Sequence, residues 1–390
     1  MLRIPFVSPT LQYDRAYASR TFLLIGLVSL VILSRAGFTS SPYFVDGPRQ
    51  VAAITSGKLF IQPPGYFLFD FFGREIYLTH LLSAATSVAV LNITLSVLGT
   101  IFFFALSVRL FPGAIGIMLA VAYAFSDTVW FTAEVHSTYA AMTFFAPAIL
   151  YFILIQERWW LVGLLWALMT GIRPSDGAFV LPCLFVLLLR RGWRDRIAFL
   201  ATALPVVLVW YVPTVQHFGG QFLSPLSSAE DEVHSLANGL LVPGVSWARK
   251  VGNTVHLGLS VLNALNILTP FAVIGLFARS RVNRIAMLWC LPGLLFFFFY
   301  FFSSSVYLAY MVAPALILAG SVLRGMSRGR SVAILACSIA CSIVQMAVLR
   351  PVRISGTKTA ILDAYTLQYT GWALKHRYSL RLRDIVEQHK

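Results

Sequence analysis

The residues of this chain that could do chemistry lie in polar segments between long apolar runs. Asp46 and Arg49 follow the first apolar run, and a turn sequence, Gln62-Pro63-Pro64-Gly65-Tyr66, comes soon after them. A carboxylate just outside lipid-embedded helices could act as a general base that removes a proton from a hydroxyl group. The alternative is an ordinary solvated loop with a Pro-Gly turn. The elements around Asp46 decide between the two.

Composition identifies those elements as membrane helices. Hydrophobic residues make up 58% of the chain and charged residues 12%, and the mean hydropathy is +0.78. In soluble globular proteins about a quarter of the residues are charged. The formal net charge of +15 comes from short basic clusters between apolar runs, as topology signals do, so no nucleic-acid partner is expected. The sequence predicts an all-α, polytopic membrane helical bundle.

About eleven apolar runs are long enough, or nearly so, to cross a bilayer. The first has no small-residue cleavage site after it, so it is predicted to be an uncleaved signal anchor. A long first external loop of about 40 residues separates it from the second run. The predicted spans are 21–38, 80–108, 112–128, 138–156, 159–172, 178–190, 197–213, 256–278, 285–302, 306–323 and 331–349.

Lysine and arginine predict the orientation of these spans. Basic residues gather in cytoplasmic loops. With a cytoplasmic N-terminus they fall in every second loop, among them Arg109, Arg158, Arg191 and Arg281. An odd number of spans leaves the basic segment 350–390 outside, where it would be attracted to anionic lipid headgroups. We therefore expect a catalytic bundle over 1–349 and a small external C-terminal tail over 350–390.

Acidic residues gather on the opposite side. Only Asp14, Glu157 and Asp195 fall in predicted cytoplasmic loops. Charges at the edge of a membrane bundle are costly to desolvate, so several that converge from different loops predict a functional site. The acids predicted to be external and close to spans are Asp46, Asp70, Glu75, Asp127, Glu134 and Asp176. Catalysis is therefore expected at the external face.

Arg173 is the strongest candidate for binding an anion. It lies where the fifth span is predicted to reach the external face, and a guanidinium group suits bidentate contact with a phosphate. The alternatives are an arginine that extends to the lipid headgroups and one that pairs with Asp176. Arg49 and Lys58 are weaker candidates for the same phosphate.

A second group of candidates follows the third span. Trp130 and Glu134 are four residues apart and would share a helix face, an arrangement found in sugar-binding sites and also at membrane interfaces. His136 could orient Asp46 or Glu134, since it titrates near neutral pH; otherwise it is a solvated loop residue. Tyr66 could contact a substrate or anchor the chain in the interfacial aromatic belt.

With these residues in place, the first half of the chain, to about residue 185, resembles the integral-membrane GT-C glycosyltransferases. It is most similar to the bacterial relatives of the eukaryotic transmembrane O-mannosyltransferases. The resemblance rests on the external Asp46, the Gln62-to-Tyr66 turn, and Trp130 followed by Glu134-Val135-His136. The chain departs from that group at Gln62 and His136, where His and Tyr are usual.

The resemblance implies transfer of a sugar from a polyprenyl-phosphate donor to an acceptor hydroxyl, with inversion at the anomeric carbon. Asp46 would be the base and Glu134 the second catalytic carboxylate. The leaving phosphate needs cations rather than a general acid. Substrates would contact Arg49, Gln62, Tyr66, Trp130, His136, Arg173 and Asp176.

The resemblance also implies partners and a location. The acceptor would be a protein or a glycan, and the site would face outward from a bacterial plasma membrane. No cofactor follows from the sequence, although a divalent cation held by Asp46 and Glu134 is one option, and no dedicated metal motif is present.

Other membrane functions remain open. A lipid-linked-sugar carrier or flippase would also be polytopic, and it would show inverted repeats and broken helices near the bilayer midplane; no clear repeat is present. A membrane acyltransferase would need a residue such as His80, His136 or His256 near a span. The departures at Gln62 and His136 also leave open a relative that has lost transferase activity.

Overall fold

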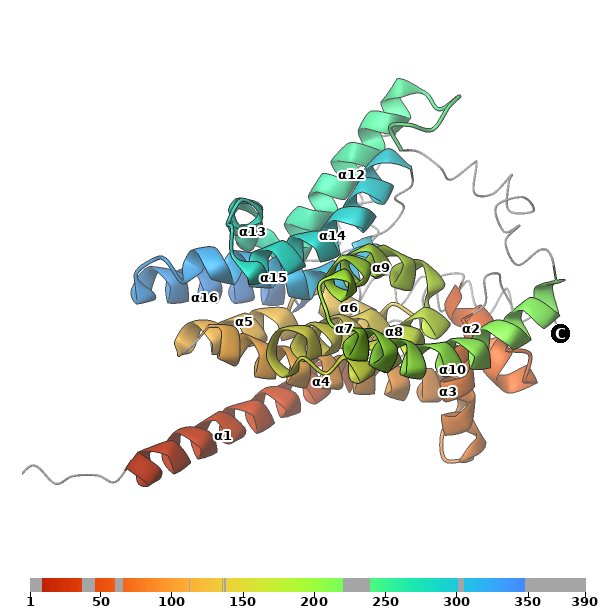
Figure 1. Cartoon of the computed structure of the whole chain (residues 1–390), viewed down its shortest axis with the longest axis horizontal. Coiled ribbons are helices and arrows are strands. Elements are labelled where there is room, and N and C mark those ends of the chain that lie inside the picture. Colours follow the sequence, from red (N-terminus) through yellow and green to blue (C-terminus); the bar gives the residue numbers. More distant parts are fainter. Residues whose placement is uncertain are drawn as a thin grey trace, which may run out of the picture.

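The structure, a computed structural model, contains only helices among the residues that it describes (Figure 1). These residues are 9–36, 46–59, 66–111, 113–134, 136, 138–219, 239–300 and 305–347. The helices in chain order are α1 (Pro9–Ala36), α2 (Asp46–Ser56), α3 (Phe67–Leu78), α4 (Ala84–Leu110), α5 (Ala114–Ala124), α6 (Asp127–Glu134), α7 (Ala140–Tyr151), η1 (Phe152–Gln156), α8 (Trp159–Ile172), α9 (Pro174–Leu189), α10 (Trp193–Phe218), α12 (Trp247–Leu265), η3 (Asn266–Leu268), α13 (Thr269–Leu276), α14 (Arg281–Phe299), η4 (Ser305–Leu308), α15 (Ala309–Leu323) and α16 (Arg328–Ala347). The predicted all-α class is confirmed.

Each predicted span coincides with a helix or with a broken pair of helices. Over the described ranges, five helical segments are long and apolar enough to cross a membrane, and the pair α5–α6, bent by 41°, makes a sixth. Three further apolar helical segments are shorter, Ala140–Gln156, Trp159–Ile172 and Pro174–Leu189. The chain is therefore a multi-pass membrane protein, while the number of about eleven crossings stays a prediction.

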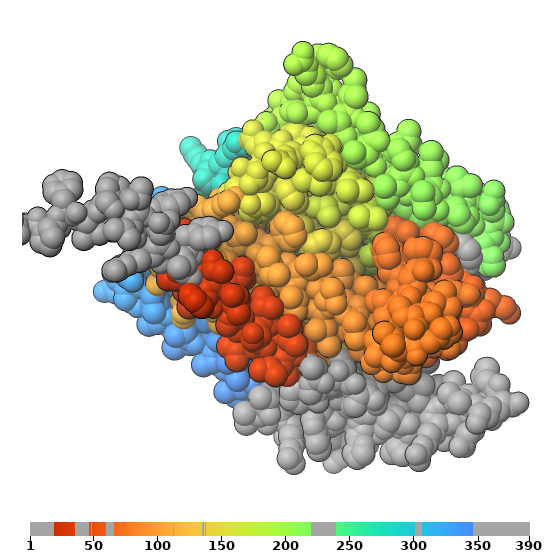
Figure 2. All heavy atoms as spheres, turned by 90° about the horizontal axis from the view of Figure 1, so that it is seen from below, coloured from red at the N-terminus to blue at the C-terminus, as the bar shows by residue number. Residues whose placement is uncertain are grey.

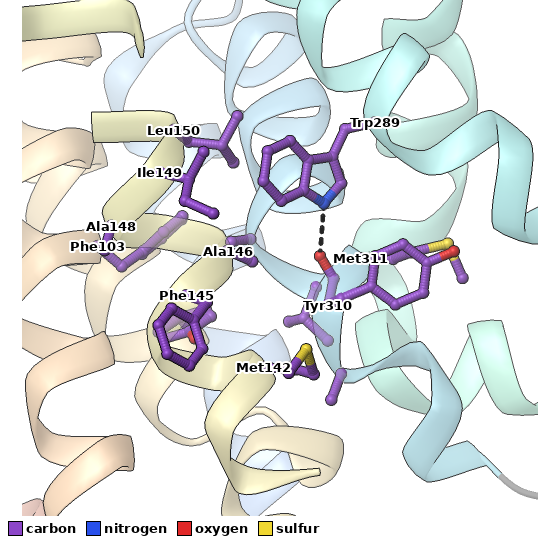
Figure 3. Close-up of a cluster of buried hydrophobic side chains, with 14 of the residues drawn as sticks. Phe103, Met142, Phe145, Ala146, Ala148, Ile149, Leu150, Trp289, Tyr310 and Met311 are labelled. Carbon is purple, nitrogen blue, oxygen red and sulfur yellow. Dashed lines mark hydrogen bonds between the residues drawn. The ribbon is translucent and has the colours of Figure 1, made fainter. Parts of the chain in front are cut away.

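The centre of the bundle is formed by α4, α7, α14 and α15. In Val306–Leu323, 78% of the residues are buried, whereas in an apolar 18-residue stretch of Trp193–Phe218 only 22% of the residues are buried. Figure 3 shows the core where α7, α14 and α15 meet, with Trp289 Nε1 donating to the Tyr310 carbonyl at 3.0 Å. On α10 the exposed residues Leu200, Leu204 and Leu208 recur every fourth position, so this helix presents an apolar face to lipid.

Gly99 allows α4 and α7 to touch at their backbones, as small residues do between membrane helices. A Cβ atom added at Gly99 would lie 2.0 Å from the Thr143 carbonyl oxygen. We expect Gly99→Ala to lower the free energy of unfolding by about 1–3 kcal/mol, because the helices must separate. Gly258→Ala on α12 is the control: no atom lies within 4 Å of the added Cβ, and the alanine should stabilise the helix by up to ~1 kcal/mol. Thermal melts in detergent measure both; equal melting temperatures would contradict the close contact.

One end of the bundle carries a cluster of charges that the sequence assigns to cytoplasmic loops. Glu157, just before α8, pairs with Arg191 at 2.7 Å and with Arg281 at 2.8 Å. These two guanidinium groups lower the pKa of the Glu157 carboxyl to about 2. The charge pattern thus correctly places the three residues together, and the side of the membrane that they face stays a prediction.

The opposite end of α8 is covered by α2 and α3, into which much of the predicted first external loop folds. A Cβ atom at Gly171, near the end of α8, would lie 2.4 Å from Leu68 Cδ1 of α3, and one at Gly73 of α3 would lie 2.6 Å from Ile54 Cδ1 of α2. Figure 1 and Figure 2 show α2 and α3 gathered at this end of the molecule, while α1 lies along the outside. The predicted tail, 350–390, lies outside the described residues.

Candidate functional site

Arg173 forms the junction between α8 and α9. Its backbone is extended, with φ −142° and ψ 95°, because a proline follows it and a residue before proline avoids the helical region. Pro174 is well suited to open the next helix, since the first turn of a helix needs no donor there. The sequence Arg-Pro therefore ends one helix, begins another and leaves the arginine side chain between them.

The side chain of Arg173 is enclosed by residues from three segments. Its Nε donates to Asp176 Oδ2 at 2.9 Å, and its Nη1 donates to Thr138 Oγ1 at 2.8 Å. The guanidinium carbon lies 3.8 Å from the centre of the Tyr139 ring and 5.7 Å from that of Tyr66. We call these five residues the arginine cluster.

The arginine cluster holds a buried cation inside the bundle, and the described residues accept hydrogen bonds from only some of its N–H groups. Arg173 is only 6% exposed, so it does not extend to the headgroups, and the pairing with Asp176 that the sequence left as an alternative is present. A buried charge of this kind requires partners, here a carboxylate and the faces of two aromatic rings. Arg173 donates two of its five N–H groups. The other three have no acceptor among the residues described, so the cluster has donors left for an oxyanion.

A second polar group lies on the short helix α6. Trp130 Nε1 donates to Glu134 Oε1 at 2.6 Å, so the two residues share one helix face as predicted. The guanidinium carbon of Arg35 lies 6.0 Å from the centre of the Trp130 ring, and the Glu134 charge acts on it electrostatically. Arg35 Nη2 donates to the carbonyl of Ala124, the last residue of α5, at 2.5 Å.

Sequence reasoning missed Arg35 and the role of Asp127. Arg35 is fully buried, and the available signal was a single arginine at the very end of an apolar run. Asp127, the first residue of α6, is also buried and accepts a hydrogen bond from Asn263 Nδ2. Both acids of α6, Asp127 and Glu134, are therefore inside the bundle, and Thr138 of the arginine cluster follows Glu134 by four positions.

The remaining predicted site residues have different surroundings. His136 is buried, and its Nε2 lies 2.9 Å from the Ala85 carbonyl oxygen, so it is not a solvated loop residue. Arg49 lies exposed on α2. Asp46 is the first residue of α2; its side chain and all of Gln62 lie outside the described residues.

The described residues contain no group of three or more His, Cys, Asp or Glu that could hold a metal ion. The side chain of Asp46 is not among them, so a divalent cation between Asp46 and Glu134 stays a prediction.

Asp70 is a buried acid next to the arginine cluster. It follows Tyr66 by one helical turn, with its N–H donating to the Tyr66 carbonyl at 3.0 Å. Its carboxyl is 3% exposed, and its Oδ1 atom has no hydrogen-bond partner among the described residues. Burial raises the pKa of Asp70 from 3.8 to about 8, so the protonated form predominates at neutral pH.

The raised pKa of Asp70 predicts a pH dependence of stability. Between pH ~4 and ~8 the unfolded chain has lost this proton while the folded protein keeps it, so the free energy of unfolding falls as pH rises. The total effect is at most roughly 6 kcal/mol. We expect Asp70→Asn to melt several degrees above wild type at pH 8 and to lose this advantage at pH 5. Equal melting temperatures at pH 8 would contradict a protonated, buried Asp70.

Comparison with known proteins places this arrangement in a known fold. No family model and no curated protein sequence matches the chain. Among solved structures, ArnT from Cupriavidus metallidurans bound to undecaprenyl phosphate matches 89% of this chain and 68% of its own, with a TM-score of 0.59 and 15% sequence identity. The chain therefore shares its helical fold with ArnT.

The other matches agree with this conclusion or add little to it. ArnT in its apo state matches with a TM-score of 0.56 and 16% identity, over 90% of this chain and 69% of its own. The arabinofuranosyltransferase AftD from Mycobacteria reaches a TM-score of 0.45 over 26% of its length, at 16% identity, and supports no argument. At 89% coverage the likeness in fold to ArnT extends well beyond residue 185, into the half of the chain where the sequence resemblance ends.

Proposed function

We propose that this chain is a membrane glycosyltransferase that takes its sugar from a polyprenyl-phosphate donor. Three features support the proposal. The helical fold is shared with ArnT, whose structure holds undecaprenyl phosphate. The first-loop helices α2 and α3 and the end of α8 lie together. The arginine cluster carries the argument, because it keeps at that end a buried guanidinium that donates only two of its five N–H groups to described residues.

The arginine cluster suits the phosphate of a lipid carrier. A phosphate that leaves from a sugar gains negative charge, and a guanidinium group stabilises that charge through charge-assisted hydrogen bonds. Arg173 is held from two sides by Asp176 and Thr138 at 2.9 and 2.8 Å, so little reorganisation is needed when the charge develops. Tyr139 and Tyr66 cover the guanidinium plane and keep water from it.

The proposed reaction is a single inverting displacement. The acceptor hydroxyl loses its proton to the carboxylate of Asp46 while its oxygen forms a bond to the anomeric carbon. The bond from that carbon to the phosphate oxygen breaks, and polyprenyl phosphate leaves with its charge on Arg173. Glu134, oriented by Trp130 at 2.6 Å, accepts hydrogen bonds from sugar hydroxyls. The base works as in inverting glycosidases, with a phosphate in place of the protonated leaving group.

The acceptor is a hydroxyl of a protein or a glycan, and an O-mannosyltransferase-like reaction is the most specific form of the proposal. The site is proposed to face outward from the plasma membrane of a bacterium, with the N-terminus inside.

Lipid binding tests the phosphate role without any knowledge of the sugar. We expect undecaprenyl phosphate to raise the melting temperature of the purified protein, whereas undecaprenol does not, because only the former has a ligand for Arg173. Arg173→Met should lose this stabilisation. Arg191 follows α9 and pairs with Glu157 at the other end of the bundle, so Arg191→Met is the matched control and should retain the stabilisation. Equal stabilisation by both lipids, or no loss in Arg173→Met, would contradict the proposal.

A further inference from the structure

A chain of polar contacts runs from α6 through α12 to α16. Asn263 of α12 donates through Nδ2 to Asp127 Oδ2 at the start of α6. Gln345 of α16 donates through Nε2 to Asn263 Oδ1 at 2.6 Å. The three residues are far apart in sequence, and both Asp127 and Asn263 are 3% exposed. None of these contacts belongs to the arginine cluster, and we call Asp127, Asn263 and Gln345 the α6 relay.

A second set of contacts fixes α16 against the same end of α12. Asn266 donates through Nδ2 to Ser342 Oγ at 2.9 Å and accepts from Ser338 Oγ at 2.6 Å. Ser338, Ser342 and Gln345 are separated by four and three residues, so they lie on one face of α16. The opposite face carries exposed Ile343 and Val344.

In lipid these hydrogen bonds help to hold α16 beside the end of α12. Membrane helices gain little from burying apolar side chains against each other, because lipid tails are equally apolar, so polar contacts and close packing hold them together. The face of α16 toward the end of α12 carries Ser338, Ser342 and Gln345, while the buried Leu335 packs into the apolar core and Ile343 and Val344 are exposed. Its contact with α12 therefore depends on these hydrogen bonds, and through Gln345 the position of α16 is linked to Asn263.

The α6 relay lies where the helix is interrupted between α5 and α6. α5 ends at Ala124, and α6 begins at Asp127 after a bend of 41°. Arg35 holds the α5 side of the bend through the Ala124 carbonyl, at 2.5 Å. Ser126 Oγ donates to the carbonyl of Ala264 of α12 at 2.8 Å. Because Asn263 also donates a hydrogen bond to Asp127, α12 contacts both Ser126 and Asp127, where α6 begins.

We infer that Asn263 and Gln345 are positioning residues that hold α6, and with it Glu134, in its working orientation. α6 has only eight residues, so a change at its first residue tilts its last, two turns away. This inference rests on the proposed function for its catalytic meaning, but the positioning itself does not depend on transferase activity. The inference links α16 to the candidate site, although the two are far apart along the chain.

Hydrogen exchange tests the positioning directly. In full-length protein, we expect Asn263→Ala and Gln345→Ala to speed amide exchange in residues 127–134 by about tenfold or more, because α6 opens locally when its start is released. The control is Cys341→Ala, an exposed residue on the lipid-facing side of α16, which should leave this exchange unchanged. Unchanged exchange in α6 for both relay variants overturns the inference, whether or not the protein transfers sugar.

Kinetics then tests the catalytic meaning. If wild type transfers sugar, both relay variants should lower kcat by about tenfold while the KM for the donor stays within about twofold, as expected when an interaction made only in the transition state is lost. In a Glu134→Gln background, Asn263→Ala should lower kcat little further, since the effects of substitutions at coupled residues are not additive. Additive losses would overturn the link to Glu134. A wild type without transfer activity would refute the proposed function and leave the exchange result to decide the positioning.

Discussion

Asp46→Asn is expected to abolish sugar transfer, with kcat reduced by about 100-fold to 10,000-fold. An amide cannot take the proton of the acceptor hydroxyl, and general-base catalysis typically contributes a factor of this size. Folding should be intact, because asparagine has the same shape and Asp46 is the first residue of α2, where either side chain can cap the helix. The rate of transfer from a polyprenyl-phosphate sugar in proteoliposomes measures the effect.

Two further variants make this expectation specific to Asp46. Glu75→Gln changes an exposed acid of the neighbouring helix α3 and should leave the rate unchanged. Glu134→Gln keeps an acceptor oxygen for Trp130 but removes the charge, and should lower the rate less than Asp46→Asn. If Asp46→Asn transfers sugar at the wild-type rate while Glu134→Gln is inactive, Glu134 is the base and Asp46 is not.

Replacing Arg173 should have the second largest effect. Arg173→Lys keeps a charge but loses the planar set of N–H groups, and we expect the KM for the donor to rise by about tenfold. Arg173→Met removes the charge as well and should raise it by about 100-fold, close to 3 kcal/mol of charge-assisted hydrogen bonding. Initial rates at varied donor concentration, with acceptor in excess, measure both changes.

The fold must be tested alongside the KM, since Arg173→Met leaves the buried carboxyl of Asp176 without its cation. Loss of one partner of a buried pair typically destabilises a protein by about 3–5 kcal/mol. The double variant Arg173→Met/Asp176→Asn removes both charges and should recover much of the melting temperature without recovering donor affinity. Recovery of both together would mean that Arg173 acts only on the fold.

The membrane class and the place of each apolar helix could be predicted because the bilayer imposes them. A segment that crosses lipid must be long, apolar and internally hydrogen-bonded, and this pattern marks α4, α10 and α14 plainly. The pattern says nothing of polar segments. It therefore did not predict that the first external loop folds into α2 and α3, or that α12 begins at Trp247, within a segment assigned to a loop.

The parts of the candidate site that contain charged residues could be predicted from the sequence. Arg173 with Asp176, and Trp130 with Glu134, stand out as isolated polar residues beside spans, and the structure joins each pair. Asn263 and Gln345 did not stand out, because uncharged amides inside an apolar run resemble ordinary variation in sequence. Their meaning comes from contacts across 136 and 82 residues of chain, which no local pattern contains.

The central claim is that this chain moves a sugar from a polyprenyl-phosphate donor to an acceptor, and transfer in liposomes tests it most directly. The purified protein would be given a panel of radiolabelled polyprenyl-phosphate sugars and a crude acceptor extract, with Asp46→Asn in parallel. We predict that label moves from one donor to the acceptor with wild type only. Label that crosses the bilayer without reaching any acceptor, equally in wild type and variant, would contradict the account and identify a carrier.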